Sequence, residues 1–182
     1  MNIFFKMAIT AIAAVTISVA AQAQQKGDMA AGGHLAIGMG DEITNVGVGG
    51  KFQYNVTDPI RLEGSLTFFL PKKYGISGIA ETKVSFWDLS VNGHYLFAVS
   101  DPITVYPLAG LGIQGWKSKT DVSGYGGGYG GGTLTGSDVC FNIGGGIDFK
   151  LSDQLFVNGE LKYKISGDWN RFIISAGVTY KF

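Results

Sequence analysis

The chain alternates apolar and polar residues with a period of two along most of its length, from residue 29 to its end. This period is typical of β-strands, whose successive side chains point to opposite faces of a sheet. The sequence therefore predicts an all-β protein with eight strands. They lie at residues 29–40, 45–56, 60–70, 83–99, 103–116, 139–151, 154–165 and 171–182.

The apolar face of these strands is nearly continuous and bulky, whereas the other face carries charged and small residues. In the last segment, Phe172 and Ile174 alternate with Arg171 and Ser175. An eight-stranded barrel is only wide enough for a small set of interior side chains, so the bulky face cannot all point inward. A tilted strand of about 11 residues does match the ~25 Å apolar band of a membrane barrel. We therefore expect an eight-stranded antiparallel up-and-down transmembrane β-barrel, with the polar face inside.

The connections between the segments fall into two kinds. Three are near-copies of one tight turn: Thr57-Asp58-Pro59, Ser100-Asp101-Pro102 and Ser152-Asp153-Gln154. The others, at residues 41–44, 71–82, 117–137 and 166–170, are longer on average. In bacterial membrane barrels short turns face the periplasm and long loops face the exterior. We expect residues 117–137 to form the longest outer loop, with no strand pattern in 118–136.

The first 23 residues have the character of an export signal. A short basic start, Met1 to Lys6, precedes an apolar run, and small residues at Ala21 and Ala23 come before Gln24. The apolar run covers residues 7–20, which is shorter than the ~20 residues of a membrane-spanning helix. We therefore predict a cleaved signal peptide at 1–23, followed by one barrel domain at 24–182.

Composition and charge exclude several classes of function. Lysine plus arginine and aspartate plus glutamate number 14 each, so the chain has no formal net charge. Without a basic excess there is no electrostatic footprint for nucleic acid, and we expect no such partner. The single cysteine, Cys140, allows neither an intramolecular disulfide nor a cysteine-based zinc site.

The signal peptide, the eight alternating strands, the repeated turns and the terminal Phe182 together resemble the small outer-membrane β-barrel (porin-like, OmpA/OmpX-type) family of Gram-negative bacteria. The resemblance implies a bacterial outer-membrane location, with outer-membrane lipid around the barrel. It also implies that Val178, Tyr180 and Phe182 in the closing strand form an assembly signal read by the barrel assembly machinery. It leaves the activity open, because this fold hosts structural proteins, adhesins, small pores and a few lipid-modifying enzymes.

Candidate catalytic residues are few. His34 and His94 fall on the inward face, whereas the Ser/His/acid sites of lipid-modifying barrels, which the resemblance brings into consideration, need the lipid-facing rim. Cys140 has no identifiable base beside it. We interpret both histidines as hydrogen-bonded interior residues and Cys140 as a packed one. We therefore expect a non-enzymatic protein without a catalytic site, cofactor or metal.

The inward face collects most of the charged residues of the strands. Because the lumen is narrow, these charges must pair with one another. Two interpretations remain open: an ion-paired network that closes the barrel, or a narrow water path that weakly prefers anions because bases outnumber acids. The predicted lumen charge network contains Lys51, Arg61, Glu63, Asp88, Asp148, Lys150, Glu160, Lys162, Lys164 and Arg171.

The expected outer loop contains a glycine tract, residues 124–132, with Tyr125 and Tyr129 inside it. It is not a phosphate-binding loop, because no strand, helix and Lys-Ser/Thr pair accompany it. Its composition is typical of a flexible loop, in which the two tyrosines are candidate contacts for an unknown surface partner. The sequence thus predicts a structural or surface-interaction role, with a narrow porin-like channel for small solutes as the alternative.

Overall fold

The computed structural model describes residues 25–40, 44–76, 80–123, 129–167 and 170–182. The predicted signal peptide lies outside these residues and stays a prediction. The described strands are β1 (Met29–Gly40), β2 (Thr44–Asn55), β3 (Ile60–Ile76), β4 (Ala80–Tyr95), β5 (Phe97–Ser100), β6 (Ile103–Ser123), β7 (Tyr129–Lys150), β8 (Leu155–Ile165) and β9 (Arg171–Lys181).

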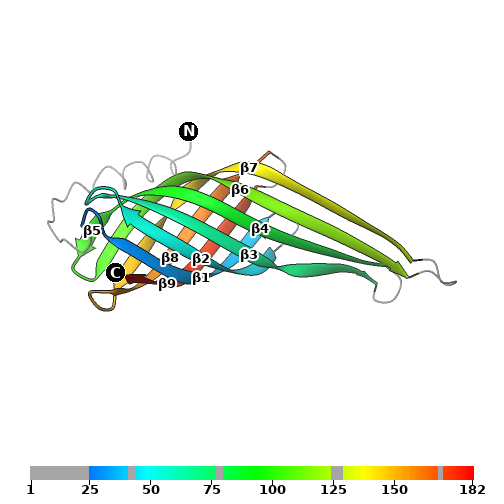
Figure 1. Ribbon diagram of the computed structural model, residues 1–182, viewed down its shortest axis with the longest axis horizontal. Coiled ribbons are helices and arrows are strands. Elements are labelled where there is room, and N and C mark those ends of the chain that lie inside the picture. Colours follow the sequence, from blue (N-terminus) through cyan, green and yellow to red (C-terminus); the bar gives the residue numbers. More distant parts are fainter. Residues whose placement is uncertain (1–24, 41–43, 77–79, 124–128, 168–169) are drawn as a thin grey trace, which may run out of the picture.

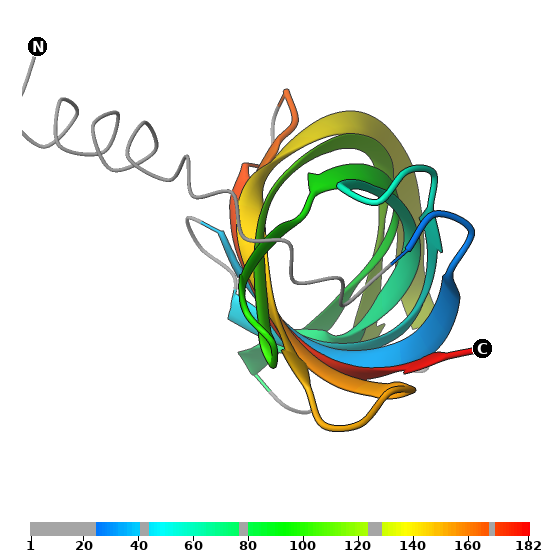
Figure 2. The same ribbon diagram turned by 90° about the vertical axis from the view of Figure 1, so that its left-hand side faces the viewer.

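The strands form a closed antiparallel barrel (Figure 2). Apart from β4 and β5, consecutive strands pair with each other, and β1 pairs with β9. Strands β4 and β5 are separated only by Leu96 and both pair with β6, so together they occupy one place in the barrel. The eight-stranded barrel predicted from the period-two pattern is therefore confirmed.

The barrel is polar inside and apolar outside. On β3, Arg61, Glu63 and Ser65 are buried, whereas the alternate residues Leu62 and Leu66 are exposed. The same alternation runs along every barrel strand, and the exposed set consists largely of Val, Leu, Ile and Phe. Water cannot cover such a surface favourably, but the hydrocarbon of a membrane can. No helix within the described residues is long and apolar enough to cross a membrane.

Two of the short turns are held by their own hydroxyl groups. The backbone N–H of Ile60 donates to Thr57 Oγ1 at 3.1 Å, and that of Leu155 donates to Ser152 Oγ at 3.1 Å. Ser and Thr side chains commonly close turns in this way. These turns lie at the same end of the barrel as the C-terminus, at the left of Figure 1.

Four strands are longer than the sequence indicated. We expected residues 71–82 and 117–137 to be loops, but β3 and β4 continue to residue 76 and from residue 80, and β6 and β7 pair as far as Ser123 with Tyr129. Figure 1 shows β3, β4, β6 and β7 running on beyond the other strands as one projecting sheet. In these extensions the apolar alternation stops, because a sheet outside the membrane needs no lipid-facing side. The strands continue because backbone pairing does not depend on that alternation.

The interior is not uniformly polar. One buried apolar cluster contains Ala36, Phe69, Phe86 and Ile173, with Val84 and Trp116 packed against it toward the projecting sheet. A second contains Leu96, Tyr106 and Leu108, near the short turns. The charged interior residues lie mainly between these two clusters, so apolar side chains contribute to closing the lumen toward both ends.

Candidate functional site

The lumen contains a network of buried ion pairs centred on Lys51. Its Nζ lies 2.7 Å from Glu160 Oε1 and 3.2 Å from Glu63 Oε2. Lys162 Nζ lies 3.2 Å from the other oxygen of Glu160, and Gln53 Nε2 donates to Glu63 Oε2 at 2.9 Å. β2, β3 and β8 supply these residues. The side chains of Lys51, Glu63 and Glu160 are at most 1% exposed, so the charges depend on one another rather than on water.

A second group surrounds Arg61. Its Nη1 donates to Asp148 Oδ2 at 2.6 Å, and its Nε donates to His94 Nδ1 at 3.2 Å. The guanidinium also lies over the Tyr106 ring, 4.6 Å from the centroid, and the His94 ring stacks on the same tyrosine. Tyr106 in turn donates its hydroxyl proton to Glu160 Oε1 at 3.1 Å, which joins this group to the one around Lys51.

A third group lies farther toward the projecting sheet. Lys164 Nζ pairs with Asp88, and both contact Ser90. Asn142 Nδ2 lies within donating distance of Ser90 Oγ at 3.2 Å and Asn92 Oδ1 at 2.9 Å. Every member of this group is buried, so the group fills the lumen at this depth.

Arg171 lies apart from the ion pairs. It donates to Asn45 Oδ1 at 2.5 Å, and its guanidinium lies over the rings of Phe69 and Phe86. The phenyl faces stabilise this charge by cation–π attraction. These inward aromatic rings were not part of the predicted charge network, although their positions in the alternation place them inside.

Lys150 is not part of the interior network, contrary to the prediction. It is the last residue of β7, a quarter exposed, and its Nζ pairs with the exposed Asp153 of the following turn at 2.8 Å. The hydrogen bond from Lys150 and its charge lower the pKa of the Asp153 carboxyl. Because Lys150 stands at the end of its strand, its long side chain can reach water. The alternation of apolar and polar residues alone does not reveal this.

Glu63, His94 and Glu160 bring three possible metal ligands within 4.8 Å of one another. Their surroundings do not suit a cation. Arg61 donates to Nδ1 of His94, so a neutral ring carries its proton on Nε2, where a metal would need a lone pair. Lys51 already bonds to both carboxylates. These residues form an ion-paired core rather than a metal site.

The other candidate nucleophiles and bases are also interior residues. His34 Nε2 and Thr67 Oγ1 form a 2.8 Å hydrogen bond inside the barrel. Cys140 is a free, buried thiol on the inward face of β7. Both placements agree with the expectation that these side chains point into the lumen. Neither lies at the lipid-facing rim, where a lipid-modifying enzyme would need its catalytic groups.

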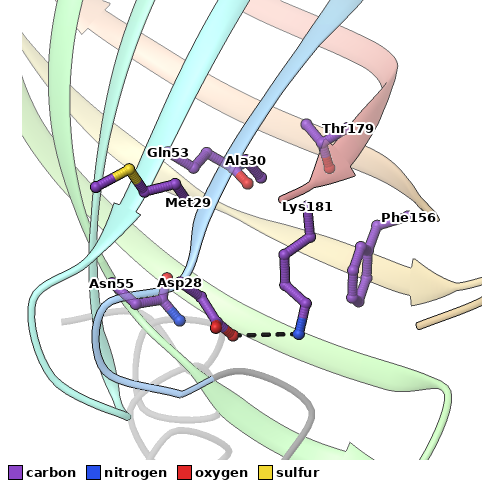
Figure 3. A pocket seen from close by; sticks show the side chains of 8 residues that line it. All are labelled: Asp28, Met29, Ala30, Gln53, Asn55, Phe156, Thr179 and Lys181. Carbon is purple, nitrogen blue, oxygen red and sulfur yellow. Dashed lines mark hydrogen bonds and ion pairs between the residues drawn. The ribbon is translucent and has the colours of Figure 1, made fainter. Parts of the chain in front are cut away.

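The lumen contains a small pocket at the end of the barrel that carries the short turns. Figure 3 shows a small cavity there, lined by β1, β2, β8 and β9, with the ion pair between Asp28 and Lys181 at 3.3 Å. Its volume of about 10 Å³ is at the lower limit for one water molecule. The segment before β1 is held to this end by hydrogen bonds from Gly27 N to Asn55 O and from Lys26 N to Asp58 Oδ1.

The residues of the predicted assembly signal lie on the outside of the closing strand. Val178, Tyr180 and Phe182 are all exposed and outward-facing. Phe182 donates its backbone N–H to Met29 O at 3.0 Å, and its ring lies 6.4 Å from that of Phe52. The last residue therefore contributes to the seam between the first and last strands.

The projecting sheet is the most prominent feature outside the barrel wall. Within the described residues, positions 129–140 of β7 pair only with β6, because pairing with β8 begins at Phe141. We call this stretch the β7 edge. Of the two predicted contact tyrosines, Tyr129 begins this edge and Tyr125 lies outside the described residues. The β-branched residues that flank the glycine tract, such as Thr120, Val122 and Thr133, were the available signal for strand.

The comparisons with known proteins agree with this architecture. The sequence model for the outer membrane protein beta-barrel domain matches residues 9–182. A comparison with curated protein sequences gives no significant match.

Several solved structures share the fold at low sequence identity. Ail, the attachment invasion locus protein of Yersinia pestis, has a TM-score of 0.60 and 15% identity, over 87% of this chain and 100% of that one. Neisserial surface protein A has a TM-score of 0.59 and 15% identity, over 85% and 96%. OprG of Pseudomonas aeruginosa has a TM-score of 0.53 and 12% identity, over 88% and 98%. At such identities the likeness establishes the fold alone, and the outer-membrane location follows from the family model.

Proposed function

Since the chain belongs to the outer membrane protein beta-barrel domain family, we propose that it is a non-enzymatic surface-interaction protein whose contact element is the projecting sheet. The single observation that carries this proposal is the β7 edge, residues 129–140, which extends above the barrel and, among the residues that the structure describes, pairs with β6 alone. An exposed strand edge offers N–H and C=O groups to an extended segment of a partner.

The composition of the β7 edge favours pairing. Among its described residues it contains neither proline nor lysine, the residues that commonly protect strand edges. Thr133 and Thr135 are exposed on one face and Leu134 on the other, with 68% of its surface accessible. A partner strand would gain backbone hydrogen bonds along the edge and an apolar contact at Leu134.

The interior supports a closed barrel over an open channel. The largest fully buried side chains include Arg61, Glu63, Lys164 and Asn92, so charged and amide groups occupy the space a solute would need. Apolar clusters lie on both sides of them. Five buried bases (Lys51, Arg61, Lys162, Lys164 and Arg171) accompany four buried acids (Glu63, Asp88, Asp148 and Glu160), a difference of 5 − 4 = +1. With one more base than acids, the lumen would prefer anions only slightly if water entered it.

The surface-interaction proposal is tested by removing the outer hairpin. Trp116 and Gly136 face each other across β6 and β7, so residues 117–135 can be replaced by Asn-Gly, which favours a tight hairpin turn. This replacement removes Leu134 and the outer half of the β7 edge. Cells that display the parent or the shortened barrel are compared for binding to immobilised proteins and glycans, at equal surface levels. We expect binding to fall to that of cells without the protein. A second variant, Tyr125→Ser with Tyr129→Ser, removes both tyrosine rings but keeps the β7 edge, so it tests the contribution of the tyrosines apart from that of the edge. Equal binding by parent and shortened barrel contradicts the proposal.

The alternative of a narrow channel is tested separately, by planar-bilayer conductance of the refolded protein. A closed barrel gives no discrete steps above the leak of the bare bilayer. Reproducible steps of one size, retained when the outer hairpin is shortened, would establish the channel instead, because the lumen and not the sheet then carries the function.

A further inference from the structure

The lipid-facing wall of the barrel contains a groove between β2, β3 and β4. It has a volume of about 500 Å³ and is open to the outside along its length. Gly50 and Gly64 form its floor. The exposed side chains of Val48, Phe52, Leu66, Phe68 and Leu89 form its walls. Gly50 stands opposite Leu66 and Gly64 opposite Phe52 in the β2–β3 register, so each glycine lies beside a bulky wall residue.

Neither backbone conformation nor packing requires glycine at these two floor positions. Among the described residues only Gly27 has a positive φ angle. A Cβ added to Gly64 would meet nothing within 4 Å, and one added to Gly50 would meet only the Gly32 carbonyl oxygen at 3.7 Å. Inward glycines differ: a Cβ at Gly110 would collide with the Val91 carbonyl oxygen. Because Gly50 and Gly64 carry no side chain beside bulky neighbours, they leave a hollow in the apolar wall that larger residues would fill.

The chemistry of the groove fits a hydrocarbon chain. Lys51 and Ser65 border it through their backbones, but their side chains are buried on the lumen side. The backbone groups of the floor are paired in the β1–β2 and β2–β3 ladders. The groove therefore presents an almost entirely apolar surface, with no side-chain group to bind a polar head.

The groove is also continuous with the surface that contacts the membrane. Its wall residues belong to the same outward apolar positions that cover the barrel from Ile60 to Leu70 on β3 and from Val46 to Tyr54 on β2. Gly50 lies midway along β2, so the groove opens into the hydrocarbon region rather than the headgroup region. We propose that it is a binding site for one acyl chain of an outer-membrane lipid, held between Phe52 and Phe68 over the glycine floor.

The test fills the groove. The parent and the variant Gly50→Leu/Gly64→Leu are refolded into phosphatidylcholine vesicles that contain phosphatidylcholine with a nitroxide near the end of one acyl chain. Electron paramagnetic resonance then gives the number of motionally restricted chains per barrel. We expect the variant to lose the most strongly restricted component, equivalent to a single chain per barrel. The matched control, Gly93→Leu/Gly159→Leu, fills two other positions with room for a Cβ that do not line the groove, and should keep that component.

Three results would overturn the proposal. The first is an unchanged restricted component in the groove-filling variant. The second is a loss that occurs with labelled phosphatidylcholine but not with phosphatidylglycerol labelled at the same chain position, since recognition would then involve the headgroup. The third is cross-linking of the parent into dimers that the variant abolishes, which would make the groove an interface between two copies. Heat-modifiable gel migration shows beforehand that both variants have folded, and Gly50→Ala/Gly64→Ala provides a smaller filling if they have not.

Discussion

Replacement of Lys51 by methionine should strongly destabilise the barrel. Lys51 bonds to Glu63 and Glu160, whose side chains are both 0% exposed. Without its ammonium group, two carboxylates face each other with oxygens within 4.8 Å. At an effective dielectric constant of ~20 their repulsion amounts to about 3 kcal/mol.

Part of that repulsion is relieved by Lys162, which contacts Glu160 at 3.2 Å. The loss of charged hydrogen bonds adds to it, since each contributes about 1.5–3 kcal/mol. We therefore expect Lys51→Met to lower the free energy of unfolding by about 3–5 kcal/mol, the range for breaking a buried ion pair from one side. Lys117→Met, which removes an exposed lysine of the projecting sheet, should change it by less than about 0.5 kcal/mol.

The assay is urea unfolding in lipid vesicles, followed by tryptophan fluorescence and by the gel shift between folded and unfolded forms. The double variant Lys51→Met/Glu63→Gln separates charge from shape, because it removes one charge of each sign and leaves the Glu160–Lys162 pair. It should recover more than half of the loss. The reasoning fails if Lys51→Met unfolds at the parent's urea concentration, or if the second substitution restores nothing.

Three further outcomes follow from the same structure. Leu161→Arg, midway along β8 on the outer face, should lower the free energy of unfolding by about 2–4 kcal/mol in the same urea assay, because the charge has no partner in the hydrocarbon. A smaller loss than that of Gln154→Arg in the periplasmic turn would reverse our assignment of the faces. Gly110→Ala should cost about 1–3 kcal/mol by overpacking against Val91, whereas Gly64→Ala should be neutral or stabilising, as unfolding measurements can show. Deletion of Phe182 should lower the yield of folded barrel from cells more than it lowers the yield of spontaneous refolding into vesicles. Equal reductions of the two yields would indicate a structural role rather than recognition by the assembly machinery.

The sequence was sufficient to predict the architecture of the barrel wall. The period of two is a local property, since successive side chains of any strand alternate between faces. The bulk of one face then decided which side meets lipid, because a narrow barrel has no room for it inside. Arg61, Glu63 and Asp88 could therefore be placed in the lumen by counting along their strands, and the structure has them there.

Other features depend on contacts that no single segment encodes. The extensions of β3, β4, β6 and β7 are formed by backbone pairing between chain segments. Outside the membrane this pairing does not require apolar side chains on either face, so the sequence carries no apolar pattern that would predict it. The partner of each charge was equally hidden: Lys51 and Glu160 are 109 residues apart, and only the stagger of the closed barrel brings them together. Lys150 follows the alternation of β7 and yet escapes the lumen, because its strand ends there. Alternation determines which face a residue occupies, whereas closure of the barrel determines its depth and therefore its partner.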